Sequence, residues 1–337
     1  MSKIGILGAG TWGTALARML CNSGHEVTVW SALAEEVRQL SSARRHPNLP
    51  DCVIPEGIRF TAGIQEACAG KEIVLFAVPS VYVRATAAAA APFVPENQLI
   101  VDVAKGIEAE TLLPLSGVIR DELRKDGKHG AITLVALSGP THAEEVARDL
   151  PTTIVSACED LSAAETVQDV FSNTCMRVYT DTDVLGVELC GALKNIIALA
   201  AGISAGLGYG DNTKAALITR GLAEMKRLGL AMGCREQTFS GLAGMGDLIV
   251  TATSRHSRNN RCGILIGQGN PPAEAIRQVG MVVEGVNALP AAMRLAEKYQ
   301  VEMPITRAVS EVVNGKMNAS DAVRLLMGRE KKPEHWR

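Results

Sequence analysis

The stretch GAGTWG, at residues 8–13, limits the possible folds of this 337-residue chain more than any other. It has the pattern G-x-G-x-x-G and stands between the apolar run KIGIL and a helical segment. In that setting Gly8 allows a tight turn, Gly10 lets a pyrophosphate approach the backbone, and Gly13 lets the helix pack closely on the strand. The helix would direct free N–H groups and its positive dipole end toward the phosphates. The stretch therefore predicts a dinucleotide-binding strand–turn–helix unit.

Apolar runs and helical stretches alternate through the first half of the chain. The further strand-like runs are EVTVW, EIVLFAVPS, QLIVDVAKG, TLVALSG, TTIVSAC and CMRVYT. Such β-branched runs between helical segments are typical of parallel strands that are buried on both faces. After Asp183 a helical period takes over, with segments near 184–207, 212–229, 272–278, 285–299, 304–314 and 319–327. The pattern predicts an α/β chain, with an N-terminal Rossmann-like doubly wound sheet in residues 1–183 and a C-terminal all-α domain in residues 184–337.

Composition and charge narrow the possible functions. The chain has 34 Lys and Arg against 36 Asp and Glu, so no general positive field is available to bind nucleic acid. Its eight cysteines are scattered, without a C-x-x-C pair or a neighbouring His at metal-ligand spacing. We therefore expect no nucleic-acid partner, no metal site and a reducing, cytoplasmic location. The chain enters a strand pattern almost at once, which predicts no targeting peptide.

The apolar run from Leu189 to Leu207 has about the length of a membrane span, about 20 residues. Lys194 and Asn195 lie inside it, and a lysine at the centre of a membrane is costly. We therefore expect a buried helix of a soluble domain and no membrane span.

Drawn as a helix, this run has an unusual second face. Large apolar residues form one stripe, whereas the other consists of Cys190, Lys194, Ala198, Ala201 and Ala205. Small neighbours would leave a trough into which the lysine projects. Burial would lower its pKa toward neutrality, where an ammonium group can give and take a proton. A lysine that reaches the surface past small neighbours is the alternative interpretation.

A second polar cluster lies in FSGLAGMGDLIVTATSRHSRNNRCG. Its carboxylate, Asp247, can pair with Lys194 and offset part of the cost of burying that charge. Ser257, Arg258 and Asn259 follow a turn and combine a guanidinium group with hydroxyl and amide donors. Because a guanidinium presents a planar fork of donors, this set is suited to a phosphate group.

Two turns of the first domain carry further candidates. VAKG contains Lys105, and LSGP contains Ser138 and Gly139, each at the carboxyl end of a predicted strand. Ligands of open α/β sheets bind at this edge, so these residues are expected on the nicotinamide side. A surface lysine and an ordinary turn are the alternative interpretations.

The position that should contact the adenosine ribose lacks the acidic residue typical of NAD-binding sheets. Trp30, Ser31 and Ala32 occupy it, and the pair Glu35–Glu36 comes too late, on the next predicted helix. Without a carboxylate there, a 2′-phosphate would be tolerated. Its candidate partners are Ser31, Arg38, Arg44 and Arg45, and for the arginines a solvated helix face is the alternative. The preference between NAD and NADP stays open.

Taken together, these motifs resemble a known family. GAGTWGTALA, VAKGIE, LSGP, ELCGALKNIIALAAGISAGLGYGDNTKAALITRGLAEM, GLAGMGDLIVT and SRNN are similar, in this order, to segments of the NAD(P)-dependent glycerol-3-phosphate dehydrogenases of bacterial type. The resemblance runs across essentially the whole chain. It implies reversible reduction of dihydroxyacetone phosphate to sn-glycerol 3-phosphate with NAD(P)H, which supplies the backbone for phospholipid synthesis.

The resemblance also implies roles for individual residues. Lys194 would be the catalytic proton donor and acceptor, with Asp247 as the carboxylate that orients it. The implied substrate contacts are Lys105, Gly139, Thr141, Lys194, Asp247, Ser257, Arg258 and Asn259. The implied cofactor contacts include the three glycines of the G-x-G-x-x-G turn and Ser31. The full set is Gly8, Gly10, Thr11, Trp12, Gly13, Ser31, Lys105, Ala143, Arg258, Val282 and Glu284.

Two departures from the family pattern concern the ligand sites. The family usually reads SGPSFA where this chain has SGPTHA, so Thr141 must supply the hydroxyl and His142 replaces an aromatic residue. The family often has a basic residue after VTLW, whereas this chain has Ser31. Both departures lie outside the segments that contain Lys194 and Arg258.

Two other functions fit parts of the pattern. A dehydrogenase of the same two-domain plan could act on a non-phosphorylated hydroxy acid or ketone, since the phosphate assignment depends on Arg258 and its neighbours. A redox-sensing protein could bind NAD(P)H without turnover, but it would have no reason to bury Lys194 beside a trough. We expect a small phosphorylated ketone or alcohol as the ligand and allow for a homodimer.

Overall fold

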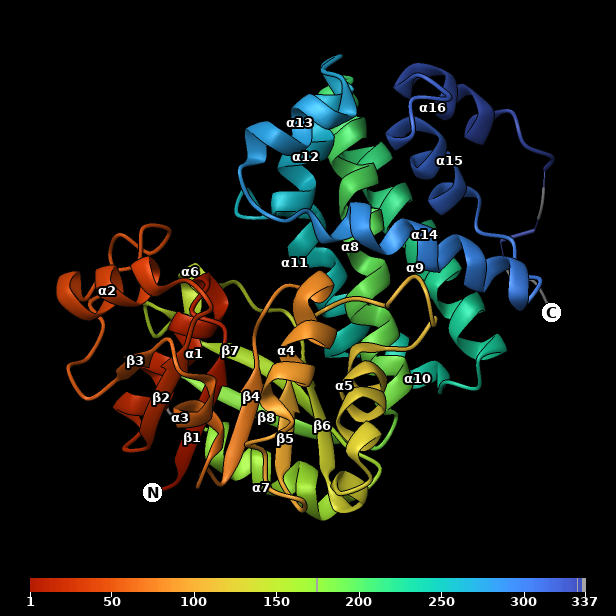
Figure 1. The fold of residues 1–337 in the computed structure, drawn as a ribbon. Coiled ribbons are helices and arrows are strands. Elements are labelled where there is room, and N and C mark those ends of the chain that lie inside the picture. The colour runs from red at the N-terminus through yellow and green to blue at the C-terminus, as the bar shows by residue number, and fades with distance from the viewer. Residues whose placement is uncertain (174, 332, 335–337) are drawn as a thin grey trace.

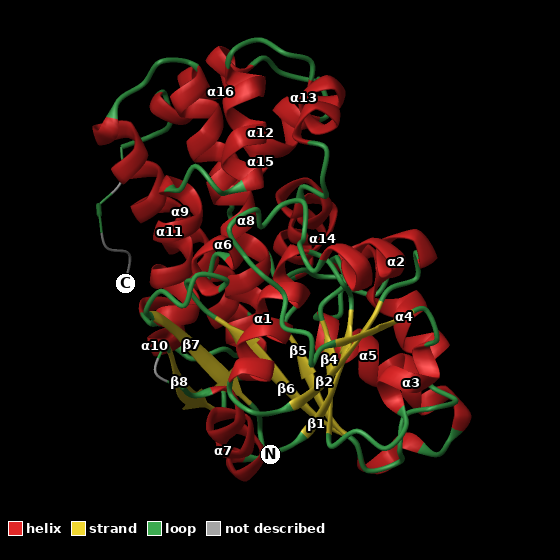
Figure 2. Cartoon of the chain, turned by 90° about the vertical axis from the view of Figure 1, so that its left-hand side faces the viewer, coloured by secondary structure: helices red, strands yellow, loops and turns green. Residues whose placement is uncertain are grey.

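The computed structural model describes residues 1–173, 175–331 and 333–334. Its first half is built on one eight-stranded sheet of order β3-β2-β1-β4-β5-β6-β7-β8, which lies below the helical part in Figures 1 and 2. The first six strands are parallel and follow the order 3-2-1-4-5-6 of dinucleotide-binding sheets. The strands are β1 Lys3–Leu7, β2 Glu26–Trp30, β3 Arg59–Thr61, β4 Ile73–Phe76, β5 Leu99–Asp102, β6 Thr133–Ser138, β7 Thr152–Ala157 and β8 Met176–Asp181.

Two details of the sheet differ from the sequence-based expectation. The three-residue strand β3 was not predicted, because its run RFT is too short to give a strand pattern. Strand β7 was expected to be parallel, but it pairs antiparallel with β6, with Ala136 opposite Ala157. The segment between these strands contains only α6, Ala143–Val146, and lacks the long crossover helix typical of parallel neighbours.

Helices cover both faces of the sheet. In β4, Ile73 and Leu75 belong to one core cluster, whereas Val74 and Phe76 belong to another, as the period of two in a strand requires. Helix α1 packs in the first cluster, and helices α4 and α5 pack in the second. The helices of this half are α1 Thr11–Asn22, α2 Ala34–Ala43, α3 Ile64–Cys68, α4 Val83–Ala90, α5 Leu115–Leu123 and α7 Leu161–Phe171, with short 3₁₀ turns η1 Ser80–Tyr82, η2 Arg124–Asp126 and η3 His129–Ala131.

The second half is helical and surrounds α8, Val184–Gly206, which is buried without a break from Gly186 to Ser204. Figure 1 shows α8 running up from the sheet through the centre of this half. The division at residues 183 and 184 stays a prediction. The other elements are α9 Asp211–Ala231, α10 Glu236–Ser240, the π-helical turn η4 Leu242–Gly246, α11 Asp247–Thr253, α12 Arg258–Gly267, α13 Pro272–Val279, α14 Glu284–Lys298, α15 Pro304–Val313 and α16 Ala319–Met327.

Helices α10, α11 and α12 were not predicted, yet α12 packs closely against α8. A Cβ atom on Gly202 of α8 would lie 2.1 Å from the carbonyl oxygen of Asn260. A Cβ atom on Gly263 of α12 would lie 2.2 Å from that of Leu199. Backbone therefore lies against backbone, which only glycine allows. The repeated G-x-x-x-G spacing, at 202–206 and 263–267, is the signal that could have predicted this helix pair.

Among the described residues, only α8 is long and apolar enough to cross a membrane. In the structure 89% of its apolar window is buried by other parts of the chain, as in the core helix of a soluble protein.

Candidate active site

The turn between β1 and α1 is open where a dinucleotide phosphate would approach. Gly8 has φ +128°, and a Cβ there would lie 2.7 Å from the carbonyl carbon of Ala77. A Cβ on Gly13 would lie 2.0 Å from the carbonyl oxygen of Gly8, so this glycine lets α1 start close to the strand. A Cβ on Gly10 would meet no atom within 4 Å, and Gly10 caps α1 without a side chain. The turn thus offers open space beside the first N–H groups of a helix, which fits a pyrophosphate.

Three further predicted cofactor residues, Thr11, Trp12 and Ala143, lie in or beside α1. Asn48 Nδ2 lies 3.5 Å from the Thr11 hydroxyl oxygen, so the loop after α2 folds back over the start of α1. Trp12 is half-buried against the core beneath α1, and Ala143, the first residue of α6, packs against the same core.

The predicted cofactor residues Val282 and Glu284 lie at the start of α14, in the helical half. Val282 is half-buried. The Glu284 carboxylate accepts a hydrogen bond from the Ser80 backbone N–H at 3.0 Å and another from the Ser80 hydroxyl. Ser80 belongs to the turn after β4, so this contact joins the helical half to the carboxyl edge of the sheet. The sequence did not predict this contact, because Ser80 and Glu284 lie 204 residues apart and only the fold brings them together.

Lys194 lies in the interior, as its small neighbours predicted. Its side chain extends from the middle of α8, is 4% exposed, and forms an ion pair with Asp247, the first residue of α11. Lys194 Nζ also donates to the Thr251 hydroxyl at 2.7 Å. The predicted pairing of Lys194 with Asp247 is confirmed. Thr251 was missed, although it lies one turn after Asp247 on the same helix face, at a spacing of four residues.

The surroundings of Lys194 set its acidity. Burial lowers its pKa from 10.5 to about 7. The Asp247 charge opposes this shift, and the nearby Lys105 ammonium adds to it. At neutral pH the group therefore exists in both protonation states, as a proton donor and acceptor requires.

Lys105 approaches the same carboxylate from the sheet. It follows β5, and its Nζ lies 2.6 Å from Asp247 Oδ2 and 3.2 Å from the Gly139 carbonyl oxygen. A Cβ on Gly191 of α8 would lie 3.3 Å from Ser138 Oγ and 3.4 Å from Lys105 Cγ, so a glycine provides the room for both. Among the described residues, buried Ser138 Oγ has no hydrogen-bond partner. A polar ligand group at this edge would satisfy it.

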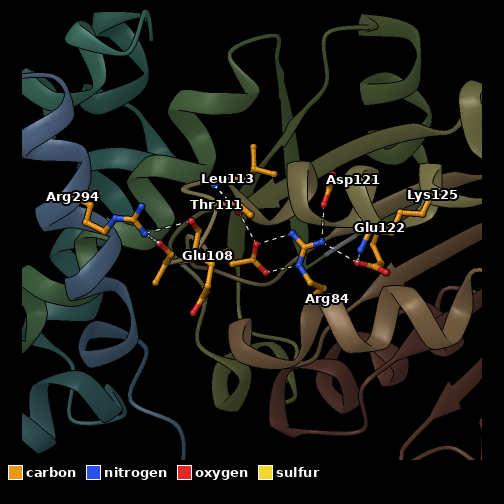
Figure 3. A network of polar contacts seen from close by, with 10 residues as sticks. Arg84, Glu108, Thr111, Leu113, Asp121, Glu122, Lys125 and Arg294 are labelled. Carbon is orange, nitrogen blue, oxygen red and sulfur yellow. Dashed lines mark hydrogen bonds and ion pairs between the residues drawn. The ribbon is translucent and has the colours of Figure 1, made fainter.

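A network of ion pairs anchors the loop that carries Lys105 (Figure 3). The Arg84 guanidinium on α4 binds both carboxylate oxygens of Glu108, at 2.7 and 2.6 Å. It also binds Asp121 and Glu122 on α5, at 2.6 and 2.9 Å. The hydrogen bond from Arg84 holds the pKa of Glu108 below its usual value. On the far side of the loop, Arg294 of α14 donates to the Ala109 carbonyl, so both halves of the protein hold this segment.

The start of α12 brings together the predicted phosphate ligands. Ser257 caps the helix by accepting from the Asn260 N–H at 3.2 Å. Arg258 is the first helical residue, and burial lowers its pKa despite the raising effect of the Glu284 charge. The Asn259 amide is directed elsewhere: its Nδ2 donates to Asn195 at 2.9 Å, and its Oδ1 accepts from the Gly285 N–H at 2.8 Å. Asn259 therefore joins α12 to α8 and α14, and Arg258 is the charged group at this helix end.

The two residues that replace the family's usual Ser-Phe pair lie between the halves of the protein. The Thr141 hydroxyl donates to the Gly139 carbonyl at 3.1 Å, beside Lys105. The His142 ring lies 5.8 Å from the His256 ring, centroid to centroid, at an angle of 55°. Burial and the Lys194 charge lower the pKa of His142, so a neutral imidazole is favoured there.

At the end of β2 the sequence-based expectation is wrong. The expectation was that no carboxylate would be present, but Glu36 of α2 reaches back and accepts a hydrogen bond from the Ser31 hydroxyl. Ser31 is 3% exposed, so its side chain serves this contact. No group of three or more metal-ligand side chains occurs within the described part of the chain.

Comparison with known proteins agrees with this geometry. The family models described as the N-terminus and the C-terminus of NAD-dependent glycerol-3-phosphate dehydrogenase match residues 3–164 and 183–324. The chain is 68% identical, over 99% of both chains, to a protein from Lactobacillus delbrueckii subsp. bulgaricus named glycerol-3-phosphate dehydrogenase (NAD(P)+) 2. It is 51% identical to one from Agathobacter rectalis named glycerol-3-phosphate dehydrogenase (NAD(P)+), over 99% of this chain and 98% of the relative.

A solved structure of a glycerol-3-phosphate dehydrogenase is also similar to this chain. The crystal structure of glycerol-3-phosphate dehydrogenase from Coxiella burnetii superimposes with a TM-score of 0.89 at 35% identity, covering 97% of this chain and 99% of that one. The similarity extends over the sheet and the helical half alike. The chain therefore belongs to the family of NAD-dependent glycerol-3-phosphate dehydrogenases.

Proposed function

We propose that this protein reversibly reduces dihydroxyacetone phosphate to sn-glycerol 3-phosphate with NAD(P)H, in the cytoplasm, and so supplies the backbone of phospholipids. One observation carries the proposal. A buried lysine with a pKa of about 7 is held by Asp247 next to Lys105, where the carboxyl edge of the sheet meets the helical half. Family membership gives the substrate, and this cluster provides the acid–base group that the reaction needs. The proposal also includes assembly of two copies of the chain into a homodimer.

Lys194 is the proton donor in this proposal. When bound, NAD(P)H would supply the hydride for the C2 carbonyl carbon of the ketone. Negative charge then develops on the carbonyl oxygen, and the Lys194 ammonium stabilises it and gives it a proton. The product is the alcohol with neutral Lys194. In the oxidation direction the neutral amine takes that proton back.

Asp247 and Lys105 hold this acid in place. Asp247 contacts Lys194 through Oδ1 and Lys105 through Oδ2, so one carboxylate orients both ammonium groups. The second ammonium provides further positive charge near the developing alkoxide. Thr251 limits the rotation of Lys194 because its hydroxyl oxygen accepts a hydrogen bond from Lys194 Nζ.

The start of α12 is the proposed phosphate site. Arg258 contributes a guanidinium group, and the helix contributes its N-terminal N–H groups and dipole. Ser257 and Asn259 shape this helix end through the contacts described above. Gly139 and Thr141 belong to the turn before His142, whose ring lies beside that of His256. Phosphate binding here would position the reacting carbon by means of interactions remote from it.

The residues at the carboxyl edge of the sheet fit a dinucleotide. Gly8, Gly10 and Gly13 form the open turn, and α1 begins there with Thr11 and Trp12. Ala143, Val282 and Glu284 complete the proposed surroundings of the cofactor, with Lys105 and Arg258 at the border with the substrate.

The decay of nicotinamide absorbance tests this function. We expect rapid oxidation of NADH or NADPH with dihydroxyacetone phosphate and only slow oxidation with unphosphorylated dihydroxyacetone. A preference for the unphosphorylated ketone would contradict the assignment of Arg258 and favour a different substrate of the same reaction. Dinucleotide binding without turnover of any ketone would favour a redox-sensing protein.

A further inference from the structure

The end of β2 lies beside the glycine turn. The Gly8 N–H donates to the Trp30 carbonyl oxygen at 2.9 Å, and the Ser31 N–H donates to the Thr61 carbonyl oxygen at 3.1 Å. Ser31 is therefore held between β3 and the turn proposed to bind the pyrophosphate. In sheets of this order, the residue at this position contacts the adenosine ribose.

A carboxylate occupies this position even though it comes from a helix. Glu36 lies on the first turns of α2, and its Oε2 accepts from the Ser31 hydroxyl. The Leu33 N–H in turn donates to Ser31 Oγ at 3.1 Å, which fixes the hydroxyl. Among the described residues, no hydrogen bond reaches the second carboxylate oxygen of Glu36. Five residues separate Ser31 from Glu36, so the chain reverses between them and returns the carboxylate to the end of the strand.

The loop after α2 places Glu36 on the side of the cofactor. Glu36 lies near His46, since its charge acts on the pKa of that imidazole. Two residues later, Asn48 lies 3.5 Å from the Thr11 hydroxyl at the start of α1. Glu36 therefore lies between the end of β2 and a loop that contacts α1. His46 is 5% exposed, and burial lowers its pKa, so it does not supply a positive charge to this position.

The arginines near this position are bound elsewhere. Arg38 pairs with Glu35 on the outer face of α2. Arg44 donates to the Ile58 carbonyl at 2.8 Å, and its guanidinium lies 5.9 Å from the centroid of the Phe60 ring. The remaining candidate, Arg45, donates to the Pro50 carbonyl at 3.0 Å. None of the three pairs with Glu36 or is directed at Ser31.

From these contacts we infer that Glu36 makes the protein select NADH over NADPH. The inference rests on the proposed function, because it assumes that the glycine turn binds a nicotinamide dinucleotide. A carboxylate at this position accepts hydrogen bonds from the ribose hydroxyls of NADH. It repels the 2′-phosphate of NADPH, and none of the three arginines Arg38, Arg44 and Arg45 is directed there to compensate for the repulsion. Ser31 acts as a positioning residue, because its hydroxyl holds one oxygen of the carboxylate.

The test compares Glu36→Gln with Glu35→Gln. Both variants lose one negative charge from neighbouring positions of α2, but only Glu36 contacts Ser31. In the wild type we expect kcat/KM for NADH to exceed that for NADPH by about tenfold or more. A factor of ten corresponds to about 1.4 kcal/mol of repulsion between the carboxylate and the 2′-phosphate. Glu36→Gln should raise kcat/KM for NADPH by about tenfold and lower it for NADH by a few-fold. Glu35→Gln should leave the ratio unchanged.

Binding measurements separate this inference from the proposed reaction. The dissociation constants of NADH and NADPH, measured by nucleotide fluorescence without a ketone, should show the same preference and the same response to Glu36→Gln. Ser31→Ala should reduce the preference by a smaller factor, since it frees the carboxylate without removing it. Equal affinity for both nucleotides in the wild type would overturn the inference. An unchanged ratio in folded Glu36→Gln protein, or equal changes in both glutamine variants, would overturn it as well. Failure to reduce dihydroxyacetone phosphate would instead count against the proposed function.

Discussion

Lys105 Nζ lies 2.6 Å from Asp247 Oδ2, a contact that joins the carboxyl edge of the sheet to the first turn of α11. The other oxygen of the same carboxylate pairs with Lys194. One buried negative charge thus faces two ammonium groups, and in the proposed reaction their excess positive charge would stabilise the oxygen that becomes negative. The halves of the protein must come together to form this arrangement, because the sheet contributes only Lys105.

Replacing Lys194 with methionine should abolish the proton transfer and keep the apolar part of the side chain. We expect kcat to fall by about 10²–10⁴-fold, the usual contribution of general acid catalysis. The dissociation constant of the dinucleotide should not change. Lys226→Met is the matched control, since Lys226 forms an exposed pair with Glu236 on the same half. Loss of dinucleotide binding in Lys194→Met would mean that the lysine is structural.

The pH dependence of turnover should follow Lys194. Reduction requires the protonated form, so kcat for reduction should fall as the pH rises through about 7, and kcat for oxidation should rise. The Asp247 charge raises the pKa of Lys194, so Asp247→Asn should move both transitions to lower pH, by about 1–3 pH units. Rate profiles in both directions check this. A profile that does not move in Asp247→Asn would show that another group titrates.

Arg258→Ala should weaken the binding of the phosphate. We expect KM for dihydroxyacetone phosphate to rise by about ten- to a hundredfold, the effect of losing a charged hydrogen bond. At saturating NAD(P)H, the slow turnover of unphosphorylated dihydroxyacetone should change far less, because this ketone makes no use of the phosphate site. Steady-state kinetics with both ketones provide the comparison, and an equal loss with both would assign Arg258 to another step.

The contact between α8 and α12 should tolerate no side chain at Gly202. A Cβ there would lie 2.1 Å from the Asn260 carbonyl oxygen, so Gly202→Ala must push the helices apart. We expect a loss of about 1–3 kcal/mol in the free energy of unfolding, measured by denaturant titration. Gly130→Ala is the control, since a Cβ at Gly130 meets no atom within 4 Å. Equal stability of the two variants would contradict the close packing.

Two buried carboxyl groups, Asp102 at the end of β5 and Glu188 on α8, should make stability depend on pH. Burial, together with the Glu188 charge, raises the pKa of Asp102 well above 3.8. The folded protein therefore holds this proton more tightly than the unfolded chain, and its stability falls as the pH rises above about 3.8 toward the raised pKa.

Asp102→Asn removes the ionisable group, and with it the loss of stability at higher pH. The amide keeps an oxygen that can accept the hydrogen bond from the Ala104 N–H. We expect the variant to gain in melting temperature relative to the wild type, with a difference that grows between pH 4 and pH 7. Thermal unfolding across this range measures it. A difference that stays constant with pH would show that the carboxyl group does not titrate there.

Patterns that depend on neighbouring residues were predictable from the sequence. The GAGTWG turn, the first parallel strands, and helix α8 with its lysine in a stripe of small residues all follow from periods and spacings within one element. The pairing of Lys194 with Asp247 was also predictable, because a buried charge requires a partner and that segment supplied a carboxylate. These predictions use only local geometry and the cost of burying a charge.

Other features depended on how distant segments pack. The direction of β7, the contact of Lys105 with Asp247, and the bond from Glu284 to Ser80 join segments whose separation in the sequence carries no periodic signal. Glu36 seemed too far along the chain to reach the end of β2, yet a tight reversal before α2 returns its carboxylate to Ser31. A sequence shows which groups need partners. Only the tertiary structure decides which partners meet, because the free energy of packing the whole core sets the position of each backbone segment.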